Sequence, residues 1–305
     1  MSHRYFPRRI SQRASALAAL LFCGFAAAAP VSQASMPAGY NYRTLDYPGA
    51  TATIIWGIND FGDLAGQYTA SGQPAHAMVY RNGRFDAVNP GDLFGDNFSA
   101  AGGPTDLGTL FGAYADDLDV QHGFVLQWGR AQTVDFTGHL NSNVDGINLL
   151  GTIAGVYWDS DGIYHGVVRS NGRDTPIDVA GARDTYPLGI NATGEIVGYW
   201  DITPESVHGF YRSANGLVFS LDEPDAGPGG TVAFAINDVD QVVGYYADAS
   251  GLFHGYVQTR GQYRNVDVPG SVATFATTIN NLGVIAGEYF DTAGKRHGFV
   301  ATPQH

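Results

Sequence analysis

Residues 231–270 read TVAFAINDVD QVVGYYADAS GLFHGYVQTR GQYRNVDVPG, and this stretch decides the fold. Small and larger apolar residues alternate over 231–236, which predicts a β-strand because successive side chains of a strand point to opposite faces. Further strands are expected over 241–247, 253–258 and 263–268. Turn-forming Asn, Asp, Ser and Gly residues separate these segments, as in β-hairpins. The stretch therefore predicts four short antiparallel strands.

The same pattern recurs six times along the chain, every 43–46 residues. In the stretch above, Asn237 lies seven residues before Gly244, and His254 lies ten residues after it. The equivalent anchor glycines and their histidines are Gly66 and His76, Gly112 and His122, Gly155 and His165, Gly198 and His208, and Gly287 and His297. Six four-stranded units of this length are typical of an all-β, six-bladed β-propeller.

The two ends of the chain predict how the ring closes. The last unit stops after its third strand, near residue 300, and has no fourth strand of its own. The N-terminal segment 42–49 (YRTLDYPG) matches residues 263–270 (YRNVDVPG), which contain the fourth strand of the fifth unit. We therefore expect the N-terminal strand to complete the last blade, in a single propeller domain over residues 40–305.

Residues 1–34 have the pattern of a secretory signal peptide. Four arginines between Arg4 and Arg13 precede an apolar run over residues 14–29, followed by small residues that suit cleavage after Ala28 or Ala34. The only cysteine, Cys23, lies inside this segment. The sequence thus predicts a mature protein that acts outside the cytoplasm, in the extracellular space or the periplasm. Export by the general route or by the twin-arginine route both stay open.

The chain is acidic, with 29 Asp and Glu against 16 Lys and Arg and a formal net charge of −13. Such a charge argues against nucleic acid and anionic membranes as partners. No segment after the signal is long and apolar enough to predict a membrane span. Glycans and extracellular proteins are the partners that we consider, and we expect a monomer.

Departures from the repeat are the candidate ligand contacts, because residues shared by all six units serve the folding of each blade. Two tryptophans, Trp56 and Trp158, occur outside the repeated positions. The second unit begins with a long Gly-rich loop that runs from Asp92 to Asp106. We predict ligand binding by these four residues.

One acidic turn is a candidate calcium site. Asp116, Asp117 and Asp119 lie in the turn between the second and third strands of the second unit. Calcium binds such oxygen ligands, although the full pattern of a calcium loop is missing, and a solvated acidic turn is the alternative. The six repeated histidines are not expected to share a metal, and we expect each imidazole to bond backbone groups in a turn of its own blade. Each histidine begins a third strand, and with strands about 4.8 Å apart, histidines on opposite sides of the ring lie too far apart.

The frame Ile-Asn-x-x-Gly-x-x-x-Gly followed by His-Gly-Phe resembles the HAF-type extracellular repeat proteins of bacteria. The resemblance covers residues 42–302; the triplet that names the family is matched most nearly by His76-Ala77-Met78. It implies an exported repeat protein without an established activity. Motifs of serine hydrolases, zinc proteases and phosphate-binding loops are absent. We therefore expect a non-catalytic binding propeller, with a glycan as the candidate ligand. The alternative is a hydrolase or lyase that acts on a carbohydrate or lactone through acids near the axis.

Overall fold

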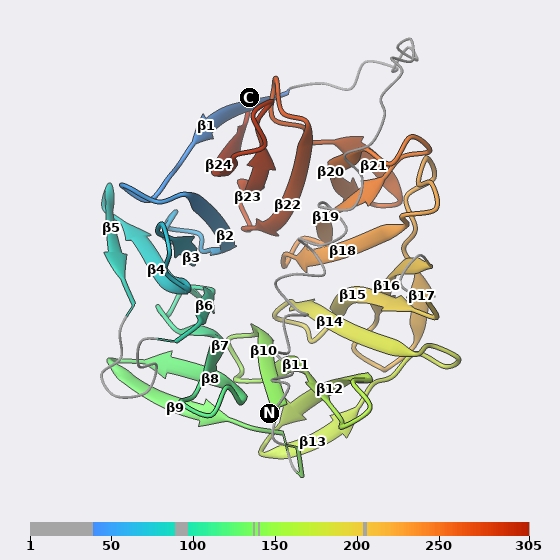
Figure 1. Cartoon of the computed structure of the whole chain (residues 1–305). Coiled ribbons are helices and arrows are strands. Elements are labelled where there is room, and N and C mark those ends of the chain that lie inside the picture. The colour runs from blue at the N-terminus through green and yellow to red at the C-terminus, as the bar shows by residue number, and fades with distance from the viewer. Residues whose placement is uncertain (1–38, 89–96, 137, 140, 204–205, 305) are drawn as a thin grey trace, which may run out of the picture.

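A computed structural model describes residues 39–88, 97–136, 138–139, 141–203 and 206–304. Over these residues the chain forms 24 strands and no helix, and the strands make a ring of six four-stranded antiparallel blades (Figure 1). The predicted six-bladed β-propeller is confirmed. None of the described segments is a helix that could cross a membrane. The predicted signal peptide, residues 1–34, lies outside the described part of the chain.

Blades 1 to 5 run from an innermost to an outermost strand in chain order, and blade 6 does so for its first three strands. The innermost strands are β2 (Ala52–Ile58), β6 (Ser99–Gly102), β10 (Asn141–Ile147), β14 (Asp184–Ile190), β18 (Thr231–Ile236) and β22 (Ala273–Ile279). The second strands are β3 (Leu64–Thr69), β7 (Leu110–Ala115), β11 (Ile153–Trp158), β15 (Ile196–Asp201), β19 (Gln241–Ala247) and β23 (Ile285–Phe290). The third strands are β4 (Ala75–Arg81), β8 (Gln121–Gln127), β12 (Tyr164–Ser170), β16 (Val207–Arg212), β20 (Phe253–Thr259) and β24 (Arg296–Pro303). The outermost strands are β5 (Arg84–Ala87), β9 (Arg130–Val134), β13 (Arg173–Pro176), β17 (Val218–Ser220), β21 (Gln262–Asn265) and β1 (Tyr40–Thr44).

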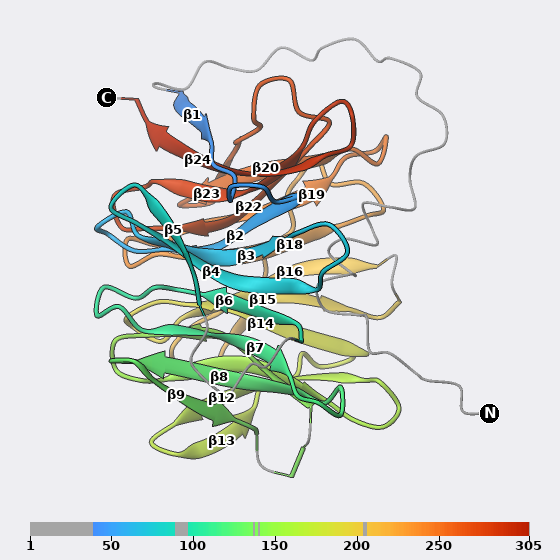
Figure 2. The same cartoon turned by 60° about the vertical axis from the view of Figure 1, so that its left-hand side comes forward.

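The last blade is completed by the N-terminal strand, as predicted. Strand β1 pairs antiparallel with β24, from Tyr40 opposite Pro303 to Thr44 opposite Phe299. The two strands lie side by side in both views although they come from opposite ends of the chain (Figures 1 and 2). A single parallel contact between Ala52 and Arg296 then joins blade 6 to blade 1. The two termini thus latch the ring.

The outermost strands are shorter than the sequence predicts. Strand β21 ends at Asn265, whereas the pattern predicted a strand to residue 268. The next residues keep contact with β20 in another way, because the Asp267 side chain turns back onto that strand. The long loop predicted to open the second unit also contains strand β6, since Ser99–Gly102 pairs with β7. Asp106 consequently lies in the turn between β6 and β7.

The repeated anchor glycine is required by a close approach of two strands. A Cβ atom on Gly244 would lie 1.9 Å from the carbonyl oxygen of Val232 on the neighbouring inner strand. The inner strand has a β-bulge at this point, between Ala233 and Ala235. Inner strands of blades 1, 3, 4 and 6 have the same bulge opposite their own anchor glycine. A bulge redirects one side chain, so five of the six blades place an irregular residue near the axis.

Candidate functional site

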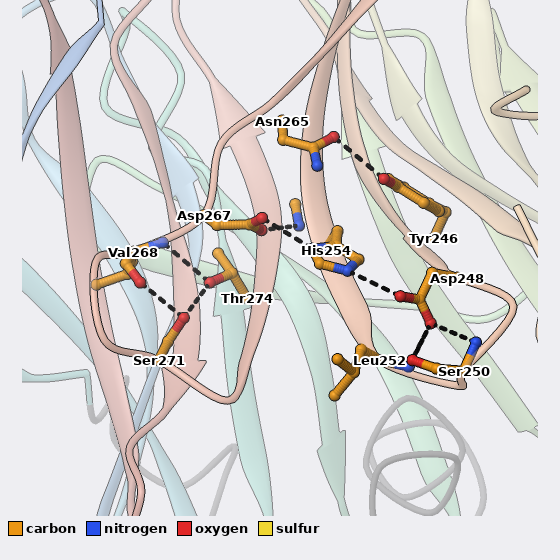
Figure 3. A network of polar contacts seen from close by, with 11 residues as sticks. Tyr246, Asp248, Ser250, Leu252, His254, Asn265, Asp267, Val268, Ser271 and Thr274 are labelled. Atoms are coloured by element: carbon orange, nitrogen blue, oxygen red, sulfur yellow. Dashed lines mark hydrogen bonds and ion pairs between the residues drawn. The ribbon is translucent and has the colours of Figure 1, made fainter. Parts of the chain in front are cut away.

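The repeated histidine of each blade lies at the centre of a network of polar contacts, as blade 5 shows (Figure 3). His254 Nδ1 lies 2.8 Å from an Asp267 carboxylate oxygen, and its Nε2 lies 3.5 Å from Asp248. The ring of Tyr246 packs beside the imidazole at 5.3 Å. The hydrogen bond to Asp267 raises the pKa of His254. The histidine thus ties two loops to the third strand of its own blade.

Four other blades repeat this arrangement, and in each the histidine pairs with an aspartate that lies just after the end of the outermost strand. The pairs and their distances are His122 with Asp135 (2.8 Å), His165 with Asp178 (2.9 Å), His208 with Asp222 (3.0 Å) and His297 with Asp46 (2.7 Å). We expected these imidazoles to bond backbone groups; that interpretation is wrong, because their partners are carboxylates. A sequence signal was present, since an Asp follows the histidine after 13 or 14 residues in four units.

An aromatic residue is repeated two positions after each anchor glycine, next to the histidine. Each of these rings packs beside the histidine of its own blade: Tyr68 on His76, Tyr114 on His122, Tyr157 on His165, Trp200 on His208, Tyr246 on His254 and Tyr289 on His297. The rings also pack against the neighbouring blade: Tyr47 stacks on Tyr68 and His139 stacks on Tyr157, each with ring centres 3.7 Å apart. Each of the six blades therefore uses one of these aromatic rings for packing.

The repeated asparagines hold neighbouring blades together. The Asn237 side-chain oxygen accepts the backbone N–H of Gln241, and its amide nitrogen donates to the Asn280 carbonyl of the next blade at 3.0 Å. Five turns share these two hydrogen bonds: the asparagine oxygen accepts the backbone N–H four residues later, and the amide nitrogen donates to a carbonyl of the following blade. These turns begin at Asn59, Asn148, Asn191, Asn237 and Asn280. The predicted structural role of these turns is confirmed, and it extends to contacts between blades.

One position differs in every blade, ten residues before each anchor glycine. It holds, from blade 1 to blade 6, Trp56, Gly102, Asp145, Leu188, Phe234 and Thr277. In five blades this is the residue at the bulge. Residues from the first five of these positions line one cavity of about 550 Å³, which we call the axial cavity. The repeat thus supplies six equivalent positions, and their different occupants make one asymmetric cavity.

Aromatic residues form much of the wall of the axial cavity. Trp56 stacks on Phe234 with ring centres 5.6 Å apart, although they belong to blades 1 and 5. Gly102 has no side chain, and the ring of Phe111 lies over it, 2.6 Å from where a Cβ would be. The cavity also reaches Pro74 and Gln121 beside the turns that lead into the third strands of blades 1 and 2. Its wall is therefore mainly apolar with a few polar groups, as in sites for small molecules.

Asp145 is a partly buried ionisable residue of this cavity, and one of its carboxyl oxygens is fully buried. The Asn143 amide donates to its Oδ1 at 2.5 Å, whereas Oδ2 has almost no solvent-accessible surface and no hydrogen-bond partner among the residues that the structure describes. Burial raises the pKa of Asp145 well above its usual range, and the hydrogen bond from Asn143 offsets this only in part. A buried carboxyl oxygen without a partner costs free energy. This cost makes Asp145 the strongest candidate for a group that awaits a ligand.

The structure brings together only two of the residues that the sequence predicted to bind ligand, because Trp56 and Asp106 both line a small hollow next to the turns that follow the inner strands. Trp56 lines the axial cavity. Trp158 is 6% exposed and packs on Tyr164 in the core of blade 3, so it does not line the cavity. Asp106 accepts a hydrogen bond from the Asp60 backbone and lines a smaller hollow of about 180 Å³ among the turns that follow the inner strands. Asp92 lies outside the described residues.

The predicted calcium residues have different environments. Asp116 Oδ1 accepts the backbone N–H groups of Leu118 and Val120, and its Oδ2 lies 3.5 Å from His122. Asp119 lines the axial cavity. Across the described segments, no group of three His, Cys, Asp or Glu side chains is arranged to hold a metal ion. Calcium binding by Asp116, Asp117 and Asp119 stays a prediction.

Sequence reasoning missed Asp145, Asn143, Leu188 and Phe234. The signal was the column ten residues before the anchor glycine, where the six units share no residue. Of the residues that the sequence predicted to bind ligand, only Trp56 falls in this column. The column contains Asp145, Leu188 and Phe234, whereas Asn143 lies two residues before Asp145 and is identified by its hydrogen bond to that carboxyl.

No protein-family model matches the chain, and no curated protein matches it either. Several solved structures share its fold. A putative TolB from Agrobacterium tumefaciens has a TM-score of 0.57 at 13% identity, over 83% of this chain and 90% of that one. The SapL1 lectin in complex with α-methyl fucoside has a TM-score of 0.51 at 14% identity, over 84% and 94%. TolB from Acinetobacter baumannii has a TM-score of 0.51 at 11% identity, over 79% and 68%. The chain is thus similar to these β-propellers in fold.

Proposed function

We propose that this chain is an exported binding propeller that takes one small carbohydrate-like ligand in the axial cavity. The observation that carries the proposal is the asymmetry of the cavity, which a repeat of six similar units would not produce for folding alone. Trp56 and Phe234 offer ring faces against which a sugar ring can pack, while Gln67, Asn143 and Asp145 offer polar groups. Aromatic walls with few oriented polar groups suit such ligands.

Export outside the cytoplasm is part of the proposal. It is supported by the basic and apolar pattern of residues 1–34 and by a mature chain without cysteine. The lectin among the structural neighbours binds α-methyl fucoside, which makes fucosides reasonable first ligands to try.

An enzyme that acts on carbohydrate is the second candidate, and one observation favours it. Burial raises the pKa of Asp145 well above its usual range, and such a carboxyl can act as a general acid. Glycoside hydrolysis usually needs a second carboxyl group about 5–10 Å away. Among the described residues that line the axial cavity, the other carboxylate is Asp119, in a turn of blade 2. One partly buried acid with one acid in a turn favours binding over catalysis.

The test is a glycan array probed with the mature protein, with and without calcium. A cavity-filling variant, Leu188→Trp, should abolish the signals while the fold persists, because Leu188 lines the axial cavity. Leu217→Trp is the matched control, since Leu217 lies in the same blade and is 58% exposed in an outer turn. Glycan signals that survive in Leu188→Trp would contradict the proposal. Turnover of a bound glycan that Asp145→Asn abolishes without loss of binding would favour the enzyme.

A further inference from the structure

The charge of the axial cavity has one sign. Asp119 and Asp145 carry the only carboxyl groups among the described residues that line it, and no Lys, Arg or His is found there. Burial favours the neutral form of Asp145, and a cation beside this carboxyl would favour its ionised form. The whole chain is acidic as well, with a formal net charge of −13. A low-dielectric cavity with walls of one charge sign attracts ligands of the opposite sign. The cavity is therefore unsuited to a carboxylate or phosphate and suited to a cation.

The aromatic residues of the cavity reinforce this preference. Trp56 and Phe234 are stacked at 5.6 Å, and Tyr186 and Tyr199 form a second stack at 4.4 Å. All four line the cavity together with Tyr245. The faces of aromatic rings carry partial negative charge, and a desolvated ammonium group beside them is stabilised. Rings that come from blades 1, 4 and 5 thus line the same cavity as Asp145.

Asp145 Oδ2 supplies the third observation. This atom is buried and has no hydrogen-bond partner among the described residues, so the protein satisfies only one oxygen of the carboxyl, through Asn143. A neutral hydroxyl could donate one hydrogen bond, but it would leave the charge of an ionised carboxylate without compensation. An ammonium group would donate a hydrogen bond and also balance the charge.

We infer that the ligand of the axial cavity carries a compact ammonium group, which lies against Asp145 and between the aromatic rings. This inference rests on the proposed function because it takes the axial cavity as the ligand site. A protonated amino sugar can donate a hydrogen bond to Asp145 and balance its charge, whereas a quaternary ammonium compound has no N–H to donate and can only balance the charge and pack against the aromatic rings. Glucosamine and choline are therefore the two probes, and N-acetylglucosamine is the neutral comparison for glucosamine.

The experiment is calorimetric titration of the mature protein with these three compounds at about pH 7, where amines are largely protonated. Glucosamine, choline or both should bind at least tenfold more tightly than N-acetylglucosamine. If only choline binds, the ammonium inference holds and the carbohydrate part of the proposed function fails. Equal affinity for glucosamine and N-acetylglucosamine would overturn the inference and leave the proposed function standing. Absence of binding by both cations up to about 10 mM would also overturn it.

Two variants assign the binding to the named residues. Asp145→Asn keeps the shape of the side chain and removes its charge, so it should weaken the bound cation at least tenfold. Asp161→Asn is the matched control, because Asp161 is an exposed aspartate in a turn of the same blade, and this change should have no effect. If Asp145→Asn does not fold, Phe234→Leu should weaken choline severalfold by removing one ring face. Unchanged affinity in the folded variant would overturn the inference.

Discussion

Two sets of repeat positions in this propeller follow opposite rules. The histidine layer consists of the six repeated histidines and the aromatic residues beside them, and the axial layer consists of the residues ten positions before each anchor glycine. In the histidine layer, five blades use an Asp-paired histidine, and all six place an aromatic ring beside it. In the axial layer, the equivalent position holds six different residues, among them a tryptophan, a glycine and a partly buried aspartate. A requirement that occurs six times selects the same residue six times. A single ligand site near the axis requires that the blades differ, so variation within the repeat marks the site.

The largest effect is expected from removing the strand that latches the ring. Deletion of residues 40–50 leaves the edge of β24 unpaired and removes the buried Leu45 and the Asp46 partner of His297. We expect a loss of at least about 4 kcal/mol of unfolding free energy, together with aggregation through the open edge. Chemical denaturation and size-exclusion chromatography measure both. A chain that begins at residue 39 is the control, and a truncated chain that stays monomeric and equally stable would refute the latch.

A second test compares two histidines at the same repeat position. His254→Ala removes the partner of Asp267 and Asp248 and should cost about 1–3 kcal/mol. His76→Ala is the matched change in blade 1, where Ala70 stands in place of the turn aspartate. It should cost less than His254→Ala, in the same denaturation experiment. Equal losses would mean that the histidines act through packing on the aromatic ring and not through their carboxylate partners.

A third test uses pH on the same residue. The hydrogen bond that His254 donates to Asp267 raises the pKa of His254 above its ordinary value of 6.5 in the folded protein. The stabilisation from this charged pair is therefore fully present below that ordinary value and is lost as pH rises through the raised folded pKa. Relative to His254→Gln, the intact protein should lose about 0.5 kcal/mol between pH 6 and 8, a small effect because the pair is partly exposed. A stability difference that stays constant over this range would show that the pair carries no charge-dependent stabilisation.

The smallest effect on the fold is expected in the acidic turn of blade 2. An Asn at position 116 can accept the same two backbone N–H groups that Asp116 accepts, just as Asn237 does in its own turn. Replacing Asp116, Asp117 and Asp119 by Asn should change the unfolding free energy by less than about 0.5 kcal/mol in calcium-free buffer. If the predicted calcium site exists, millimolar calcium raises the melting temperature of the intact protein alone. No calcium effect on the intact protein would make the calcium prediction wrong.

The sequence predicted the fold almost completely because each blade has its own copy of every signal. Strand β18 and strand β19 have the predicted bounds, and the match between residues 42–49 and 263–270 located the latch. The outer strands were predicted too long, since Asp267 leaves the ladder to reach His254. The axial cavity was harder to foresee. Its residues are far apart in the chain, and the burial of Asp145 depends on side chains from several blades.

The most direct test of the account is the number of binding sites on each chain. Calorimetric titration with a ligand found on the glycan array, or with the ammonium probe that binds, should give one site per chain. Leu188→Trp should abolish that site, whereas His76→Ala should leave its affinity and stoichiometry unchanged, because His76 belongs to the histidine layer. Several equal sites per chain that persist in Leu188→Trp would contradict the account, since the ligand would then bind the repeated features of the blades and not the axial cavity.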